Sequence, residues 1–152
     1  MKSKFNYPVT KIIKVIDGDS IRVEIDRGFR DYSIRDVRLL DIDAPERNTT
    51  AGKMVRDVVT WWASNLQPQD YLVLHSFELD KYGRILGDIT PAGSSLLPAF
   101  LTDYLRGCKL VRDYAGGSRA IWSEQELSGV CKRAAVILNA AAEQQRAENG
   151  LL

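Results

Sequence analysis

Two runs of alternating, largely β-branched residues meet at the dipeptide Asp17-Gly18. The first run covers residues 9–16 and the second covers residues 20–26. Alternation with a period of two is typical of strands with one buried face. Asp-Gly is a frequent hairpin turn because both residues tolerate positive φ. The segment therefore predicts an antiparallel hairpin, and any fold of this chain has to contain it.

Three further strands are expected along the chain. A turn at Arg27-Gly28-Phe29 leads into a third strand over residues 31–40, which completes a meander. A fourth strand is predicted over residues 71–79 and a fifth over residues 84–89. Between these two, Gly83 fits the left-handed position that follows a type I turn.

Two helices are predicted within the same region. Thr49 or Thr50 can cap the first, which runs to about residue 66 and stops before Pro68. The second is expected to open at Ser94 or Ser95, to include Phe100, and to close at residue 107. Both segments carry apolar residues at helical spacing, so one face of each helix should be buried.

The last part of the chain predicts a third helix and completes the fold class. Ser123 and Glu126 have the spacing of a capping box, which opens a helix over about residues 123–147. A short extended segment over residues 109–114 and a glycine-containing loop precede it. Five strands with a helix after the third are typical of a Greek-key barrel of the oligonucleotide-binding (OB-fold) type, here an α+β protein with three helices. We expect one domain over residues 1–152, with its core at residues 9–114.

Composition narrows the class of protein without fixing its partner. The chain has 152 residues, 45% of them apolar, and a net charge of +1, values typical of a globular protein. The small net charge does not indicate a polyanionic partner, so any basic footprint must be local. An apolar leader and a membrane-length apolar run are both missing from the sequence, which predicts a cytoplasmic protein without membrane contact. Cys108 and Cys131 are expected to be free thiols, and His75 is expected to be structural.

Acids and arginines gather at the predicted strand boundaries. Asp19 follows the first turn, Asp43 and Glu46 follow the third strand, and Arg38 and Arg84 lie next to strand ends. Carboxylates bind hard cations, and the planar arginine fork binds phosphate oxygens. Glu46 can act as general base towards a water molecule between them. This set of residues predicts a metal-assisted phosphodiesterase in which Arg38 and Arg84 clamp the phosphate.

The cation is predicted to be held by the carboxylates of Asp19 and Asp43 and by the backbone carbonyl of Ala44. Oxygen donors suit Ca²⁺, with Mg²⁺ as an alternative, and not zinc. Asp17 is expected to brace the hairpin turn through local hydrogen bonds. Arg38 and Asp43 are an odd number of positions apart, so a regular strand would place them on opposite faces. The strand must therefore bulge or end between them.

These segments resemble the staphylococcal nuclease (thermonuclease) family over about residues 9–114. The resemblance lies in Asp17-Gly18-Asp19, in the run from Arg38 through Asp43 and Pro45 to Glu46, and in the turn Lys81-Tyr82-Gly83-Arg84. It implies a Ca²⁺-dependent endonuclease that acts on DNA and RNA and leaves 3′-phosphate ends. It also implies the same metal ligands, with Arg38, Glu46 and Arg84 as the catalytic side chains.

The resemblance extends to candidate substrate contacts. Lys81 and Tyr82 fall on the family's turn, where the lysine meets a terminal phosphate. Of the family's paired tyrosines near the base, only Tyr114 has a counterpart, and stacking on a base or plain packing both stay open for it. Ser20 and Ala44 stand where the family commonly has threonine.

An alternative reading is a catalytically silent OB-fold module that binds nucleic acid. The presence of all five acids and arginines favours the enzyme. We expect a monomer that acts on DNA, RNA or both, at single-stranded or unpaired regions. Because uncontrolled cleavage would harm a host cell, we also expect a phage or mobile element as its source, or an inhibitor or targeting partner.

Overall fold

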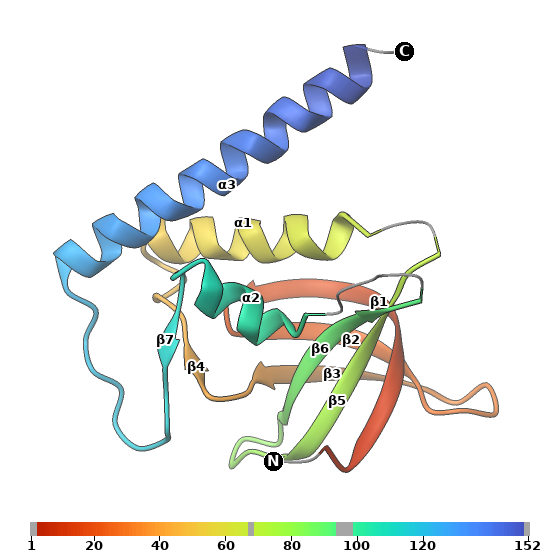
Figure 1. Cartoon of the computed structure of the whole chain (residues 1–152). Coiled ribbons are helices and arrows are strands. Elements are labelled where there is room, and N and C mark those ends of the chain that lie inside the picture. Colours follow the sequence, from red (N-terminus) through yellow and green to blue (C-terminus); the bar gives the residue numbers. More distant parts are fainter. Residues whose placement is uncertain (1–2, 67–68, 94–98, 151–152) are drawn as a thin grey trace.

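The computed structural model describes residues 3–66, 69–93 and 99–150. Five strands close into a barrel in the order β1-β2-β3-β6-β5 (Figure 1). Their bounds are β1 (Phe5–Asp17), β2 (Ser20–Asp26), β3 (Tyr32–Leu39), β5 (Tyr71–Leu79) and β6 (Ile85–Ala92). Neighbouring strands are antiparallel except for β3 and β6, which pair in parallel. The predicted five-stranded barrel is confirmed.

Three helices and a small second sheet complete the fold. The helices are α1 (Thr50–Ser64), α2 (Leu101–Gly107) and α3 (Glu124–Gly150). The second sheet pairs β4 (Ile42–Asp43) with β7 (Arg112–Asp113) and was not predicted. α1 packs between the barrel and α3, and the C-terminal half of α3 extends beyond α1 (Figure 1). Within the described residues, no helix combines the length and the apolar character needed to cross a membrane.

Local capping explains where two of the helices begin. Thr49 is the N-cap of α1, and its Oγ1 accepts a hydrogen bond from the backbone N–H of Gly52 at 3.0 Å. Ser123 and Glu126 form the predicted capping box, with both reciprocal hydrogen bonds at 3.0 Å. The prediction was wrong for Phe100, which is extended and precedes the first residue of α2. The predicted start of that helix at Ser94 or Ser95 lies outside the described residues.

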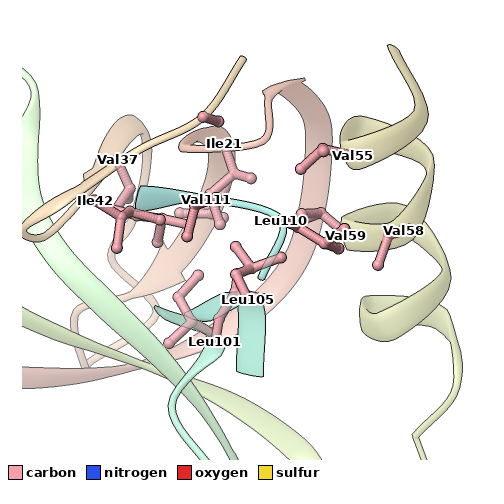
Figure 2. Packing of buried hydrophobic residues seen from close by; sticks show 14 of the residues in the cluster. Ile21, Val37, Ile42, Val55, Val58, Val59, Leu101, Leu105, Leu110 and Val111 are labelled. Carbon is pink, nitrogen blue, oxygen red and sulfur yellow. The ribbon is translucent and has the colours of Figure 1, made fainter. Parts of the chain in front are cut away.

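A single apolar cluster joins the barrel to the helices and holds the chain around the site. Figure 2 shows side chains of the strands, of α1 and of α2 meeting in this cluster. Among its fully buried members are Ile21, Val37, Ile42, Val55, Val58, Leu101, Leu105 and Leu110. Burial of an aliphatic side chain of this size stabilises a fold by about 1.5–3 kcal/mol. Ile42 therefore anchors the two-residue strand β4, and with it the position of Asp43.

Gly18 is required for a different reason from the one that the sequence indicated. The Asp-Gly turn was expected to use positive φ, but Gly18 is not among the residues with positive φ. A Cβ on Gly18 would lie 2.5 Å from Cγ1 of Val55 and 3.0 Å from Cβ of Ala44. Only glycine therefore lets α1 pack this closely against the β1–β2 turn. Gly83, by contrast, has φ of +81°, as its predicted turn requires.

Candidate active site

β3 and β4 are separated by a sharp change of backbone direction. β3 ends at Leu39, and Asp41 adopts a left-handed conformation with φ of +61° before β4 begins at Ile42. The predicted end of the strand between Arg38 and Asp43 is confirmed. This turn brings the chain back towards the β1–β2 hairpin, so that acids from both segments meet.

Asp19 ties the hairpin turn to the β3–β4 connection. Its carboxylate is buried, and Oδ2 accepts a hydrogen bond from the backbone N–H of Ala44 at 3.0 Å. Oδ1 accepts a hydrogen bond from the Ser20 hydroxyl at 3.4 Å, and Nη2 of Arg38 lies 3.6 Å from Oδ2. The backbone N–H of Leu39 donates to the Asp19 carbonyl at 2.8 Å. These contacts fix the direction in which the Asp19 carboxylate points.

Arg38 is a buried connector as well as a candidate phosphate ligand. Only 6% of its side chain is exposed. Nη1 donates to the carbonyl of Leu39 at 2.8 Å and Nη2 donates to the carbonyl of Ile42 at 2.7 Å. The guanidinium thus spans the end of β3 and the start of β4. One N–H of each amino group is used in this way. Arg38 also lines the cleft between β3 and the turn that precedes β6.

Asp43 is held by an arginine that the sequence analysis did not single out. Arg112 is its cross-strand partner in the β4–β7 pair, and both Nε and Nη2 donate to Oδ2, at 3.1 and 3.0 Å. Arg112 in turn contacts the carbonyl of Ala120, the carboxylate of Glu126 and the ring of Trp122. Because Oδ2 accepts both hydrogen bonds from this arginine, Oδ1 is the oxygen of Asp43 that has no hydrogen bond within the described residues.

A second unpredicted arginine lies among the acids. The Arg119 guanidinium places Nε 3.5 Å from Oδ1 of Asp43, Nη2 4.0 Å from Oδ2 of Asp19, and Nη1 3.5 Å from Oε1 of Glu46. Within the described residues, none of these ion pairs is also a hydrogen bond, and the buried Oδ1 of Asp43 accepts none. Three predicted site residues, Asp19 from the β1–β2 turn and Asp43 and Glu46 from the segment between β3 and α1, therefore converge on one positive group.

Glu46 is placed by the start of α1. Its carbonyl accepts hydrogen bonds from the Thr49 hydroxyl at 2.6 Å and from the Thr49 N–H at 2.9 Å. The helix residue Gly52 lies against this carbonyl so closely that a Cβ there would overlap it. The side chain of Glu46 is 63% exposed. The backbone of Glu46 is therefore fixed, while its carboxylate stays open to water, as a general base needs.

Asp17 does not have the role expected for it. Its Oδ1 is buried and has no hydrogen-bond partner in the described part of the chain, so it does not brace the turn through that oxygen. Burial raises the pKa of the Asp17 carboxyl, and the negative charges of Asp19 and Glu46 raise it further, while Arg47 and Arg119 lower it. The negative charges of the site are therefore close enough to Asp17 to affect its protonation.

Asp17, Asp19, Arg38 and Arg119 line a cleft of about 760 Å³. Asp43 is buried, and Glu46 lines a smaller pocket that shares Arg119 with the cleft. Arg84 lines the cleft from the start of β6, and its Nε donates to Oδ2 of Asp80 at 2.7 Å. Lys81 and Tyr82 line the same wall, and the Tyr82 ring is flanked by Nζ of Lys81 at 5.2 Å and by Cζ of Arg84 at 5.5 Å. The parallel pairing of β3 with β6 brings this wall beside Arg38. The cleft thus joins both predicted arginines to Asp19 and to Arg119.

Tyr114 closes the cleft on the side of the loop that follows β7. Its hydroxyl donates to the carbonyl of Gly117 at 2.6 Å, and its N–H donates to the carbonyl of Asp41 at 2.9 Å. Its ring centre lies 5.9 Å from Cζ of Arg38 and 6.0 Å from Cζ of Arg119. The ring therefore lies near two guanidinium groups, and its stacking on a base stays a prediction.

The donor set fits a divalent cation. Two buried carboxylates from different segments face one positive group, and one of their oxygens, Oδ1 of Asp43, lacks a hydrogen bond in the described structure. Oxygen donors of this kind suit Ca²⁺ or Mg²⁺. Among residues 3–66, 69–93 and 99–150, no three side chains of His, Cys, Asp or Glu are grouped so as to hold a metal ion. Asp19, Asp43 and the Ala44 carbonyl stay predicted ligands, and water would complete the coordination.

Arg112 and Arg119 were missed because neither belongs to a recognisable motif. Arg112 lies 69 positions from Asp43 in the sequence, and only the β4–β7 pairing brings the two together. The sequence placed Arg112 next to Tyr114 and gave Arg119 as an isolated charge after a glycine pair. Neither arginine is near a predicted site acid in the sequence, so only the topology shows that they belong to the site.

The fold and the cleft define an OB-type barrel with an acid and arginine site at the β1–β2 turn. No family model matches the chain. The chain is 32% identical over 79 residues to Protein ParB of Escherichia coli, and the aligned region covers 52% of this chain and 40% of that protein. It is 32% identical over 91 residues to an uncharacterized endonuclease of Escherichia coli, covering 56% of this chain and 54% of the relative.

A third relative is also named as a nuclease. The chain is 35% identical over 77 residues to micrococcal nuclease of Shigella flexneri, covering 51% of this chain and 39% of that protein. The chain thus spans about half the length, or less, of the curated relatives that it matches. These matches and the barrel confirm the resemblance to the staphylococcal nuclease family, and the domain is staphylococcal-nuclease-like.

Proposed function

We propose that this protein is a metal-dependent nuclease that hydrolyses phosphodiester bonds of DNA, RNA or both. One observation carries the proposal: Asp19 from the β1–β2 turn and Asp43 and Glu46 from the segment between β3 and α1 all lie within 4.0 Å of the Arg119 guanidinium, and Arg119 lines a cleft together with Asp19, Arg38 and Arg84. The names of two relatives, an endonuclease and a micrococcal nuclease, support the same reaction.

Each side chain has a distinct task in the proposed reaction. Arg84 uses Nε to bind Asp80, so its two amino groups are directed to the phosphate oxygens. Arg38 contributes the donors that do not bind the β3 and β4 carbonyls. Glu46, the most exposed of the three acids, accepts the proton of the attacking water.

Asp19 and Asp43, with the Ala44 carbonyl as third protein ligand, would hold the cation. The bound cation, Ca²⁺ or Mg²⁺, supplies positive charge beside the phosphate as negative charge develops there. Arg112 binds the Asp43 carboxylate through Oδ2, which leaves Oδ1 as the oxygen that would bind the cation. Removal of one fixed donor to a developing negative charge commonly lowers the rate by about 10²–10³-fold.

The test is cleavage of single-stranded DNA, double-stranded DNA and RNA in Ca²⁺, in Mg²⁺ and in chelator. We expect cleavage that requires a cation and that falls by at least about 10²-fold in Glu46→Gln. Glu143→Gln, on the exposed surface of α3, removes the same charge away from the cleft and is the matched control.

Cleavage in chelator, or equal rates for Glu46→Gln and Glu143→Gln, would contradict the proposal. Binding of the nucleic acids without any cleavage would favour the alternative of a silent binding module. The same substrates test the preference for single-stranded or unpaired regions, which stays a prediction together with the monomeric state and a restraining partner.

A further inference from the structure

Arg119 differs from the other arginines of the site in how it is held. Arg38 spans two backbone carbonyls, and Arg112 makes two hydrogen bonds to Asp43 and contacts three further groups. Arg119 makes ion pairs at 3.5–4.0 Å and, within the described part of the chain, no hydrogen bond. Its side chain is 40% exposed. All five N–H groups of its guanidinium thus stay available for a stronger partner.

The loop that carries Arg119 can change its backbone conformation at low cost. It contains Gly116 and Gly117, with φ of +93° and +87°. A Cβ at either glycine would meet no atom within 4 Å, so the space beside both glycines is open, while the carbonyls of Gly117 and Ala120 accept hydrogen bonds from Tyr114 and Arg112. Glycine reaches both halves of φ space with similar ease. The Arg119 side chain itself is held, within the described residues, by ion pairs and by the Tyr114 ring, so rotation about its own bonds can change its partner.

Arg119 and a divalent cation cannot both bind closely to Asp19 and Asp43. Asp19 and Asp43 are 4% and 2% exposed, and burying two neighbouring carboxylates without a compensating positive charge is costly. Arg119 supplies part of that charge. A divalent cation bound to the same two carboxylates would repel the guanidinium at close range. Arg119 and the cation therefore compete for the same oxygens.

We propose that Arg119 exchanges between two anionic partners, pairing with the acids when no divalent cation is bound and with a substrate phosphate when one is. This inference rests on the proposed nuclease function. A phosphate that enters the cleft between Arg38 and Arg84 comes next to Arg119. Arg119 is also the arginine of this site with no donor committed to a protein acceptor in the described structure. It then acts as a substrate-binding residue in addition to the predicted pair.

The first arm of the test is Ca²⁺ binding by isothermal titration calorimetry, without nucleic acid. The proteins compared are the wild type, Arg119→Ala, Arg119→Lys and Arg146→Ala. Arg146 lies near the end of α3, so Arg146→Ala removes the same charge at a distance from the site. We expect Arg119→Ala to bind Ca²⁺ on the order of tenfold more tightly than the wild type, with Arg146→Ala unchanged and Arg119→Lys in between.

The second arm is the steady-state KM for an oligonucleotide in saturating Ca²⁺. We expect Arg119→Ala to raise KM on the order of tenfold, because a charge-assisted bond to phosphate is lost. Opposite effects on the two ligands are the signature of exchange, whereas a damaged fold would weaken both. Circular dichroism of each variant checks the fold.

Each outcome decides the inference. Equal or weaker Ca²⁺ binding by Arg119→Ala, or no Ca²⁺ binding by either protein, overturns it. Tighter Ca²⁺ binding with an unchanged KM overturns the transfer to phosphate. If the wild type does not cleave nucleic acid but Arg119→Ala still binds Ca²⁺ more tightly, the nuclease function fails while the competition for the acids stands.

Discussion

Replacing Arg38 by lysine and by methionine separates what the arginine contributes through its shape from what it contributes through its charge. Its guanidinium donates to the carbonyls of Leu39 and Ile42 at 2.8 and 2.7 Å, and lies 3.6 Å from the Asp19 carboxylate. These two carbonyls flank the left-handed turn between β3 and β4. A lysine keeps the charge, but one ammonium group cannot reproduce the planar spacing of two amino groups.

The expected loss follows from these contacts. Arg38→Lys loses at least one hydrogen bond from a charged donor, which is worth about 1.5–3 kcal/mol. Arg38→Met loses both bonds and also removes the nearer of the two guanidinium groups beside the buried Asp19, and breaking a buried ion pair typically costs about 3–5 kcal/mol. For a chain of this length, each kcal/mol lowers Tm by about 2–4 °C. The lysine variant should therefore unfold about 3–12 °C below the wild type, and the methionine variant should unfold lower still.

The assay is urea unfolding followed by tryptophan fluorescence at neutral pH, with thermal unfolding in parallel. Arg22→Lys is the control, because Arg22 binds Asp36 on the exposed surface of the barrel and should tolerate the change. If Arg38→Lys stays within about 0.5 kcal/mol of the wild type, the bridge between β3 and β4 does not stabilise the protein as argued. Equal losses in the lysine and methionine variants would show that the positive charge beside Asp19 contributes little.

Three further predictions concern two residues that support the backbone of the site, Gly18 and Thr49, and the one histidine of the chain, His75. Gly18→Ala should cost about 1–3 kcal/mol in urea unfolding because its Cβ would overlap Val55, and a cycle with Val55→Ala should be non-additive; additive losses would argue against the clash. Thr49→Ala should lose about 0.5–2 kcal/mol and also reduce cleavage, since its hydroxyl caps α1 and holds the Glu46 carbonyl, and Thr49→Ser should restore both; an unaffected cleavage rate would separate the cap from the site. Burial lowers the pKa of His75, so the unfolded state binds the proton more readily. The stability that His75 contributes is therefore present above its unfolded pKa of about 6.5 and is lost below it; unfolding measured from about pH 7.5 to 5.5 should show a steeper loss for the wild type than for His75→Gln, and parallel curves would refute this.

The sequence by itself determined the features that are settled over a few residues. Alternation and turn chemistry located the barrel strands, and β2 and β5 begin and end at the predicted residues. Side-chain capping located the starts of α1 and α3, because a cap and the N–H that it binds are three positions apart. His75 was expected to be structural, and it pairs with Thr90 at 2.7 Å and packs on Phe100. Local geometry leaves few alternatives at such positions.

The choice of site residues also came from the sequence, through the order and spacing of acids and arginines, but their partners did not. Only the closed barrel and the β4–β7 pair place Arg112 on Asp43 and Arg119 among the three acids. Likewise, the need for Gly18 arises from α1, which begins more than 30 positions later in the chain. Contacts between distant segments depend on how strands close and helices pack, and ion pairs over such separations leave no periodic pattern in the sequence that specifies them.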